Sequence, residues 1–501
     1  MERIIESLTG FLDTLSGIIW GPFVLIPLLA ITGFYLTVRL GLIQFVRLGA
    51  GLRLGLLRRK DDATAEGDIS QFQALTTALA ATVGTGNIVG VATAIGLGGP
   101  GALFWMWVTG VLGMASKYAE AFLGVRYRTT DATGAKSGGP QYYLERGIKG
   151  PLGKFLGLFF SIAALLACFG IGNMTQSNSI AANVESSFGV DTLVTAIVLA
   201  VLTLAVLVGG IKSIGKVTAG FVPVMIIFYV GAALWILIVN VDQILPALGL
   251  VFSDAFTGTA ATGGFAGAVM AAAVRYGMAR GIFSNESGMG SAAIAAAAAQ
   301  TTHPVRQGLV SMTQTFIDTI IVVSFTGLVI ITTGTWSNVD PNTGEQVSAA
   351  LMTGQAFSTG LPGQWGHWVV TIGLALFAYS TILGWSYYGE RQVERLFGAG
   401  LIMPFRVIFA AVVFFGATQE LDLVWLFSDV MNGLMALPNL IGLIILSGLV
   451  ARETKLYLRH DPKLEAAGPE IAAFMADDPG YSEWVAQERQ INDRRQAGAT
   501  D

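Results

Sequence analysis

The chain has 501 residues, of which 53% are hydrophobic and 12% are charged. A soluble protein carries roughly 25% charged residues, so this composition excludes a soluble globular protein and indicates an all-α polytopic membrane protein. The formal net charge of −4 argues against nucleic acid as a partner. A single cysteine and three scattered histidines offer no disulfide and no recognisable metal cluster, and we expect no cofactor.

Eleven apolar stretches are long enough to cross, as helices, a bilayer core of about 30 Å. In chain order they are 18–38, 70–97, 101–125, 155–183, 190–210, 217–239, 263–298, 309–333, 366–388, 404–418 and 425–450. The loops between them alternate between a set rich in Lys and Arg and a set that contains neither. The positive-inside rule places the basic loops in the cytoplasm. We therefore expect a multi-pass protein of the cell (inner) membrane, with its N-terminus outside and its C-terminus inside.

Three regions are expected along the chain. Residues 1–69 hold a short amphipathic lead-in, the first transmembrane helix and a basic cytoplasmic connector, 70–450 form the core, and 451–501 form a polar, solvated cytoplasmic tail. Within the connector, basic residues alternate with Leu, Ile and Phe over 39–69. This pattern suits an amphipathic helix on the inner leaflet and an ordinary connector about equally well.

The second apolar stretch contains Gly84, Gly86 and Gly90 within seven residues. Each glycine costs a helix about 1 kcal/mol relative to alanine, so the helix is predicted to unwind between Thr82 and Asn87. Unwound backbone at this depth survives only where it faces protein or a cavity, and it frees N–H groups for a carboxylate and C=O groups for a cation. Close helix packing through Gly86-x-x-x-Gly90 is an equally good interpretation.

A second interruption is predicted in the seventh apolar stretch, which contains Gly277, Gly281, Gly288 and Gly290. A new half-helix could be capped by the Ser284 side chain. We favour four residues for a binding pocket here: Gly281, Phe283, Ser284 and Asn285.

The same stretch carries Arg275, Arg280 and Glu286, and ionisable groups at membrane depth are costly and usually functional. An internal ion pair between Arg280 and Glu286 that only stabilises the fold is the alternative. In the eighth stretch Asp318 is a further candidate for an ion or a proton, although the sequence offers it no partner.

Two more polar clusters suit one shared cavity. Asn173 and Gln176 are three residues apart in the fourth stretch and share a helix face; interhelical hydrogen bonding is the alternative role. In the ninth stretch the Ser380 and Thr381 hydroxyls could ligate a small cation together with carbonyls of the second stretch, or they could bond back to their own helix. Such a site, without a clear carboxylate, suits a monovalent ion such as Na⁺, to which a substrate carboxylate could add a ligand.

At these residues the chain resembles the alanine or glycine:cation symporter family, also called sodium:alanine symporters. The matching segments are Ala81–Gly90, Gly138–Gly147, Gly172–Ser179, Arg280–Ser291 and Leu383–Arg391. The resemblance implies a leucine-transporter-like core of two inverted five-helix repeats, formed by spans 2–6 (70–239) and spans 7–11 (263–450), with the first span as an extra N-terminal helix.

The resemblance also implies a small neutral amino acid bound between the two breaks, its carboxylate near Thr82–Gly86. The residues expected to bind it are Thr82, Gly84, Thr85, Gly86, Asn87, Phe169, Asn173, Gln176, Gly281, Phe283, Ser284, Asn285, Thr381 and Trp385. The implied Na⁺ site consists of the Ala80 and Val83 carbonyls with the Ser380 and Thr381 hydroxyls.

The predicted function is import of small neutral amino acids, alanine or glycine, coupled to Na⁺ by alternating access. One alternative is H⁺ coupling, with Asp318 or Glu286 as the proton carrier; another is an ion channel with a continuous polar pore lining. An enzyme is not expected, because the sequence offers no nucleophile–base pair and no soluble catalytic domain.

Overall fold

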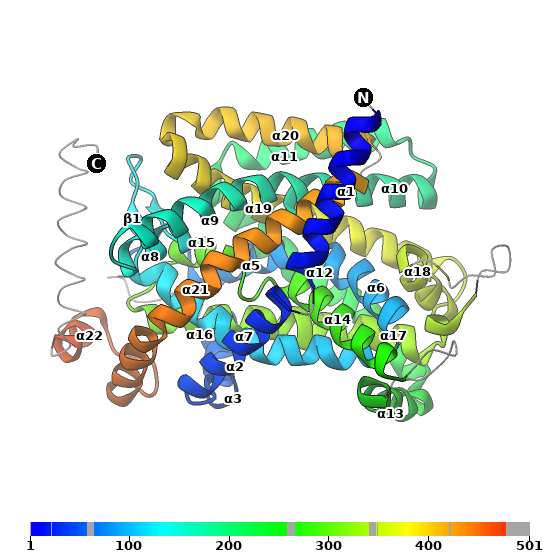
Figure 1. The fold of residues 1–501 in the computed structure, drawn as a ribbon, viewed down its shortest axis with the longest axis horizontal. Helices are drawn as coiled ribbons and strands as arrows, with labels where there is room; N and C mark the ends of the chain where they lie inside the picture. Colours follow the sequence, from blue (N-terminus) through cyan, green and yellow to red (C-terminus); the bar gives the residue numbers. More distant parts are fainter. Residues whose placement is uncertain are drawn as a thin grey trace.

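The computed structural model describes residues 2–21, 23–57, 65–257, 266–339, 347, 349–419 and 422–476. The described part is almost entirely helical, with one short antiparallel hairpin in which β1 (Thr129–Thr130) pairs with β2 (Lys136–Ser137). In Figure 1 most of the long helices run across the width of the molecule, so that α3 (Ile43–Val46) and α22 (Gly468–Met475) lie near one end. At the other end lie α13 (Val241–Thr257) and α18 (Ala349–Gly360).

Residues 70–239 form the first half of the core. Its helices are α5 (Gln71–Thr82), η2 (Thr85–Asn87), α6 (Val89–Gly98), α7 (Gly101–Arg126), α8 (Pro140–Gly147), α9 (Pro151–Phe169), η3 (Gly170–Met174), α10 (Thr175–Phe188), α11 (Thr192–Leu207) and α12 (Gly210–Val239). A capping box begins α5, because Ser70 Oγ accepts from the Gln73 N–H and the Gln73 side chain accepts from the Ser70 N–H.

The described residues between 266 and 460 follow it. Their helices are α14 (Ala266–Asn285), α15 (Ser291–Ala297), α16 (Pro304–Thr315), η4 (Phe316–Val323), α17 (Ser324–Thr332), η5 (Thr335–Ser337), α18, α19 (Trp365–Phe397), η6 (Ala399–Leu401), α20 (Ile402–Thr418) and α21 (Asp422–His460). Both η3 and η4 are π-helical turns inside longer helices, a feature often found at functional sites.

Six continuous helical stretches are long and apolar enough to cross a membrane, by length and composition, within the described residues. They are Pro151–Phe188, Gly210–Val239, Pro304–Thr332, Trp365–Phe397, Ala399–Thr418 and Leu423–His460. Six is fewer than the eleven predicted spans because some predicted spans are divided or short. The second, for example, is split into α5 and α6, and the fifth corresponds to the 16-residue α11.

The first predicted span, 18–38, is not one helix. Residues Glu2–Ile19 form α1, the chain turns near Gly21, and Leu25–Arg39 form α2. The two helices both pack against α21, and α1 crosses in front of α21 in Figure 1. The lead-in is therefore a full helix that covers the core.

The connector after α2 is built of short pieces: α3, α4 (Leu48–Leu52) and the π-helical η1 (Arg53–Leu57). It packs against the transmembrane core, because α4 and η1 contact α16. At Gly51 the contact is so close that a Cβ atom would lie 2.4 Å from the Leu309 carbonyl oxygen. Of the two sequence interpretations, the described part of the connector fits a packed connector.

The beginning of the predicted solvated tail is packed instead of solvated. Leu464, Ile471 and Met475 are buried, and α22 contacts α21. The mixed charge of the tail predicted that it is solvated, but burial of these apolar side chains favours packing against the protein. The rest of the tail, 477–501, lies outside the described residues.

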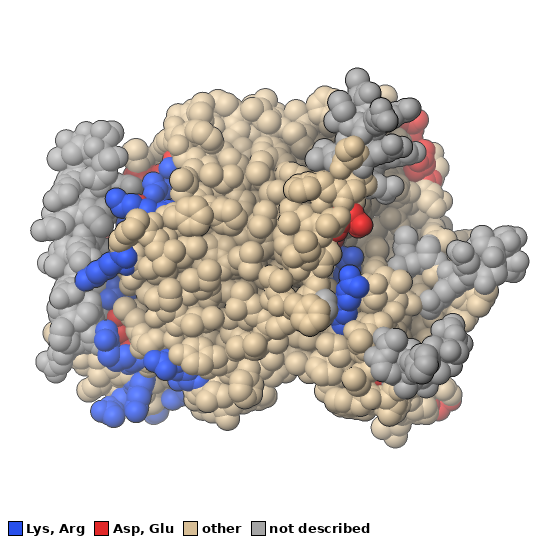
Figure 2. All heavy atoms as spheres, in the orientation of Figure 1, with Lys and Arg blue, Asp and Glu red and all other residues tan. Residues whose placement is uncertain are grey.

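Charge is unevenly distributed over the surface. On the face shown in Figure 2, Lys and Arg gather at the end that carries α8 and α22, and the wide middle band is mostly uncharged. Large apolar side chains are exposed on α11, α12 and α20, among them Val201, Ile227 and Ile408. Exposed apolar side chains around an uncharged band are what a lipid-facing surface requires.

Candidate substrate and ion site

The first break lies at the residues where the sequence predicts it. Helix α5 ends at Thr82, a 3₁₀ turn covers Thr85–Asn87, and α6 begins at Val89. The Gly84 N–H donates to Asn87 Oδ1 at 3.0 Å, so the Asn87 side chain holds the unwound backbone. Both residues are buried, and their polar groups need such partners because no water is present to satisfy them.

Close approach explains two of the glycines in this break. A Cβ atom at Gly84 would lie 2.5 Å from Thr381 Oγ1, and one at Gly86 would lie 3.1 Å from the Cα atom of Ser284. At Gly90, in contrast, a Cβ atom would meet nothing within 4 Å. The Gly86-x-x-x-Gly90 pattern is therefore not a continuous packing stripe, and Gly86 is the position at which the first break touches the last turn of α14 (Ala266–Asn285), next to the second break.

The second break separates α14 from α15. Ser284 lies inside α14 and does not cap a new helix, which differs from the expectation; the chain leaves the helix only after Asn285. Glu286 and Gly288 follow with φ of +54° and +90°. A glutamate in the left-handed backbone conformation is strained. Lys117 Nζ donates to the Glu286 backbone oxygen at 2.9 Å and stabilises this conformation.

The Glu286 side chain is bonded within the core and is not paired with Arg280. Its Oε1 atom accepts from Trp385 Nε1 at 2.8 Å, and its Oε2 atom accepts from Ser291 Oγ. Arg280 instead stacks over the Phe283 ring, 5.5 Å from its centroid. The alternative of an Arg280–Glu286 ion pair is therefore wrong.

The two breaks are joined by Asp318, which lies in the π-helical turn η4. Its Oδ1 atom accepts from Asn87 Nδ2 of the first break at 2.7 Å, and its Oδ2 atom accepts from Ser284 Oγ at 3.1 Å. Thr319 Oγ1 also donates to Oδ2, at 2.8 Å, and accepts from Asn285 Nδ2 at 3.1 Å. The residue for which the sequence offered no partner thus connects both breaks.

The predicted cation ligands come together between α5 and α19. Ser380 Oγ lies 3.1 Å from the Ala80 carbonyl oxygen and 3.5 Å from that of Val83. The same hydroxyl donates to its own helix at Phe377 O, 2.8 Å away, and Thr381 Oγ1 bonds to the same oxygen at 3.1 Å. Ser380 therefore reaches carbonyls of the first break and also bonds back to its own helix, and Thr381 bonds back to its own helix. Cation binding by these groups stays a prediction.

The predicted residues of the fourth span divide into two groups. Gln176 contacts the first break: its Oε1 accepts from the Thr85 N–H at 3.4 Å, and its Nε2 donates to Thr85 Oγ1 at 3.3 Å. Asn173 instead donates to the Phe409 carbonyl of α20 at 2.8 Å, and Phe169 packs on the Phe409 ring. Asn173 therefore makes the interhelical bond that was the alternative interpretation.

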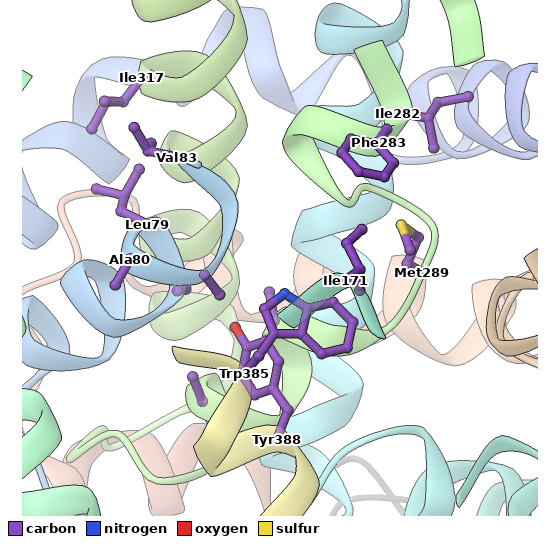
Figure 3. Close-up of a cluster of buried hydrophobic side chains, with 14 of the residues drawn as sticks. Leu79, Ala80, Val83, Ile171, Ile282, Phe283, Met289, Ile317, Trp385 and Tyr388 are labelled. Carbon is purple, nitrogen blue, oxygen red and sulfur yellow. The ribbon is translucent and has the colours of Figure 1, made fainter. Parts of the chain in front are cut away.

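Some of the remaining predicted residues lie beside the first break and others lie away from it. Thr82 Oγ1 accepts from Gln314 Nε2 at 3.1 Å, beside the first break. Gly281 packs against α7, where a Cβ atom would lie 2.3 Å from Thr109 Oγ1. Figure 3 shows Val83 on one side, Phe283 on the other and the Trp385 indole below them. The two breaks and Trp385 therefore surround a common region of the core.

The geometry of two buried, mutually contacting helix breaks agrees with a family assignment from the sequence. The profile described as "Sodium:alanine symporter family" matches residues 5–470 of the chain. The chain belongs to the sodium:alanine symporter family. Its members and this chain's relatives are transporters and not enzymes. The match extends to residue 470 and so includes part of the predicted tail, 451–501.

Two curated relatives place this member within the family. The sodium/alanine symporter AgcS of Methanococcus maripaludis is 53% identical over 449 residues, which cover 89% of this chain and 97% of that protein. The amino-acid carrier protein AlsT of Bacillus subtilis is 34% identical over 429 residues, covering 85% and 88% of the two chains.

A solved structure gives the fold. The crystal structure of MhsT in complex with L-phenylalanine matches with a TM-score of 0.53 and 16% identity, over 86% of this chain and 98% of that one. This family member is therefore a multi-pass helical membrane protein with a leucine-transporter-like fold.

One buried ionic cluster was not predicted from the sequence. Lys117 and Glu120 of α7 are fully buried, and their charged atoms are 3.9 Å apart. Glu120 Oε1 accepts from the Gly290 N–H at 2.9 Å and from Asn439 Nδ2 at 2.8 Å, so the cluster supports the second break. Two ionisable residues three apart in the apolar stretch 101–125 are the sequence signal that could have revealed it.

Proposed function

We propose that this symporter imports small neutral amino acids, with alanine as the leading substrate, together with Na⁺ by alternating access. The observation that carries the proposal is the convergence of the Ala80 and Val83 carbonyls on the Ser380 hydroxyl, beside the unwound backbone at Gly84. Neutral oxygens of this kind suit a hard monovalent cation, and a broken helix supplies them at membrane depth.

The N–H groups of the first break support a carboxylate site next to the cation. The Thr85 N–H bonds to Gln176 Oε1 at 3.4 Å, which is long for a hydrogen bond. A substrate carboxylate would form a shorter, charge-assisted bond to this N–H. Because Na⁺ and a carboxylate attract each other, each would bind more tightly when the other is present.

The walls of this region favour a small side chain. Gly86 packs on Ser284 and Phe283, with distances of 3.1–3.4 Å from the position of its missing Cβ. Trp385 is buried and fixed by its bond to Glu286. We expect a fixed indole and a phenyl ring to restrict the substrate to a small side chain such as that of alanine or glycine, because a larger substrate would have to displace one of the rings.

The halves 70–239 and 263–450 are proposed to be inverted repeats. Corresponding members of the two halves pack together: α7 against α16, α10 against α19 and α11 against α20. Such pairing is expected when a pseudo-two-fold axis relates the halves. Under this proposal α5–α6 and α14–α15 are equivalent broken helices, and α1 and α2 precede the repeats.

We also propose that the N-terminus is outside and the C-terminus cytoplasmic in the cell membrane. The end of the molecule that carries α8 and α22 is the end at which Lys and Arg gather in Figure 2. The positive-inside rule makes this end cytoplasmic.

H⁺ coupling is a second candidate because of one observation. The Asp318 carboxylate receives hydrogen bonds from Asn87 and Ser284, one from each break, and it has no ion-pair partner within 4.0 Å in the described part of the chain. A carboxylate in this position could bind H⁺ in one transport state and release it in the other. Glu286, which is bonded to Trp385 and Ser291, has less freedom for this role.

The deciding experiment is uptake of labelled alanine into proteoliposomes. We expect saturable uptake driven by an inward Na⁺ gradient at equal pH on both sides, with glycine competing and larger amino acids competing weakly. Uptake driven by a pH gradient without Na⁺ would instead select the H⁺ candidate. Unsaturable permeation of alanine would contradict both.

A further inference from the structure

A cavity of about 520 Å³ lies beside the turn between β1 and β2, at the end of the molecule that carries α8 (Figure 1). Besides residues 133–135 of that turn, its walls are the start of α12, Glu390 and Arg391 of α19, and the start of α20. The volume is within the range of about 300–1,000 Å³ that small-molecule sites occupy. None of the substrate or ion residues assigned above lines it, so the cavity has no role in the proposed transport site.

Two arginines are fixed in the cavity wall by bonds to carboxylates. Glu390 Oε1 accepts from Arg391 Nη2 at 2.8 Å, and Glu390 Oε2 accepts from Arg406 Nε at 2.7 Å. Arg391 Nη1 also donates to Asp131 Oδ2 at 2.8 Å. Both oxygens of Glu390 are therefore engaged, and this carboxylate does not compensate a further donor in the cavity.

The cavity has more hydrogen-bond donors than these carboxylates engage. Arg391 is 3% exposed, and its Nε has no hydrogen-bond partner among the described residues. Lys212 lines the cavity and forms no ion pair of 4.0 Å or less within the described part of the chain. It lies in the first turn of α12, which no side chain caps, and the free N–H groups of a first turn carry partial positive charge. A phosphate group, with its negative charge and several acceptor oxygens, matches these donors.

The cavity is continuous with surface that suits lipid chains. Met403 of α20 lines the cavity and is 47% exposed. Val208, at the end of α11, is 51% exposed, and its backbone oxygen accepts from Arg406 Nη1 at 3.2 Å. The acyl chains of a phospholipid could therefore lie against α11 and α20 while its phosphate reaches the cavity. Basic pockets between transmembrane helices on the cytoplasmic side bind anionic lipid headgroups in this way.

Asp68 indicates which headgroup the cavity suits. Its carboxylate lines the cavity, and its Oδ2 atom accepts from the Lys136 N–H at 2.7 Å. The hydroxyl groups of a glycerol headgroup can donate to such a carboxylate, whereas a choline headgroup has no donor. A zwitterionic headgroup would also bring no net negative charge to Lys212 and the start of α12.

We propose that this cavity binds the headgroup of an anionic phospholipid of the phosphatidylglycerol class, from the leaflet on the proposed cytoplasmic side. Lys212 and the first turn of α12 bind the phosphate, and Asp68 accepts from the glycerol hydroxyls. Because the turn between β1 and β2 and α12 belong to the first half of the core, and α19 and α20 follow in the second, the bound lipid joins the two halves. The proposal does not depend on which substrate or ion is transported.

The test is thermal unfolding of the purified full-length protein in detergent, with short-chain phosphatidylglycerol added at increasing concentration. We expect the lipid to raise the unfolding temperature of the wild type saturably, because a ligand that binds only the folded state stabilises it. Lys212→Gln should unfold at the wild-type temperature without lipid. It should need roughly tenfold more phosphatidylglycerol for a half-maximal shift, because a charge-assisted bond is lost.

The matched control is Lys216→Gln, which removes an exposed lysine one turn further along α12 that does not line the cavity. It should respond to phosphatidylglycerol as the wild type does. An equal loss of response in both variants, or no shift in the wild type, would overturn the site. An equal shift with inorganic phosphate would assign the cavity to a free anion, and an equal shift with short-chain phosphatidylcholine or phosphatidylethanolamine would overturn the choice of headgroup.

Discussion

At the scale of the residue, Ser380 and Ser386 form a natural comparison within α19. Ser380 Oγ reaches the carbonyls of Ala80 and Val83, whereas Ser386 Oγ bonds only to its own helix, at Leu383 O. Ser380→Ala is expected to raise the Na⁺ concentration for half-maximal alanine uptake roughly tenfold, since a lost polar ligand costs about 1–3 kcal/mol. The measurement is uptake against Na⁺ concentration, and an equal effect of Ser386→Ala would contradict the assignment.

Gly86 and Gly90 allow a second comparison between neighbouring residues. An added methyl group at Gly86 presses on the backbone of Ser284, while one at Gly90 meets open space. We expect Gly86→Ala to lower the alanine uptake rate about tenfold, because overpacking costs about 1–3 kcal/mol, and Gly90→Ala to leave it unchanged. Equal uptake by the two variants, at equal amounts of folded protein, would show that the breaks do not need this contact.

At the scale of the element, the shape of the first break depends on one amide. Asn87 accepts from the Gly84 N–H and donates to Asp318, so Asn87→Ala removes the side-chain partner of the buried Gly84 N–H and one of the hydrogen bonds to the Asp318 carboxylate. Each loss costs about 1–3 kcal/mol, and we expect a clear fall in the unfolding temperature measured in detergent. Asn178, which bonds to the Gln419 carbonyl at the surface, is the control. A similar fall for Asn178→Ala would argue against a special role for the break.

The elements also show which features a sequence can predict. Both helix breaks were predicted, because glycine clusters act over a few residues, as at Gly84 and Gly288. Two partners of those breaks were not predicted: Asp318 lies 231 residues from Asn87, and Lys117 lies 169 residues from Glu286. Side-chain contacts over such separations depend on how whole helices pack, which periodicity and propensity do not specify.

At the scale of the whole molecule, Arg306 joins the tail to the core. It is buried, and its guanidinium donates to the Tyr457 hydroxyl at 2.7 Å, Asp461 Oδ2 at 3.1 Å and the Ala466 carbonyl at 2.6 Å. Breaking a buried ion pair costs about 3–5 kcal/mol, so Arg306→Gln should make residues 461–476 accessible to protease. In inside-out vesicles of Arg306→Gln the tail should be cleaved rapidly. The control is Arg395→Gln, which removes a partly exposed ion pair with Glu145, and its tail should resist the protease. Cleavage only in right-side-out vesicles would contradict the proposed orientation.

This docking should also depend on pH. Burial raises the pKa of the Asp461 carboxyl, but the N–H groups of Glu465 and Ala466, with Tyr457 and Arg306, outweigh it and hold the pKa below its usual range. Because the pKa is lowered in the docked state, ionised Asp461 stabilises docking at any pH above the pKa of the unfolded state. The stabilisation is lost as the pH falls through the pKa of the docked state. Protease resistance of the tail should therefore persist at pH 5–7 and decline in stronger acid. Loss of resistance on raising the pH from 5 to 7 would show that another group controls docking.

The buried charges of α7 have a consequence for biogenesis. Arg126 pairs with Glu453 at 3.1 Å, and Glu120 bonds to Asn439 at 2.8 Å, so the partners are made more than three hundred residues later. During synthesis α7 must leave the translocon before these partners exist, when Glu120 faces only Lys117 of its own helix. A charge at mid-membrane costs about 2.5–3.5 kcal/mol. The contacts of this helix are therefore complete only when α21 arrives, which makes the last long helix a condition for the packing of the third predicted span.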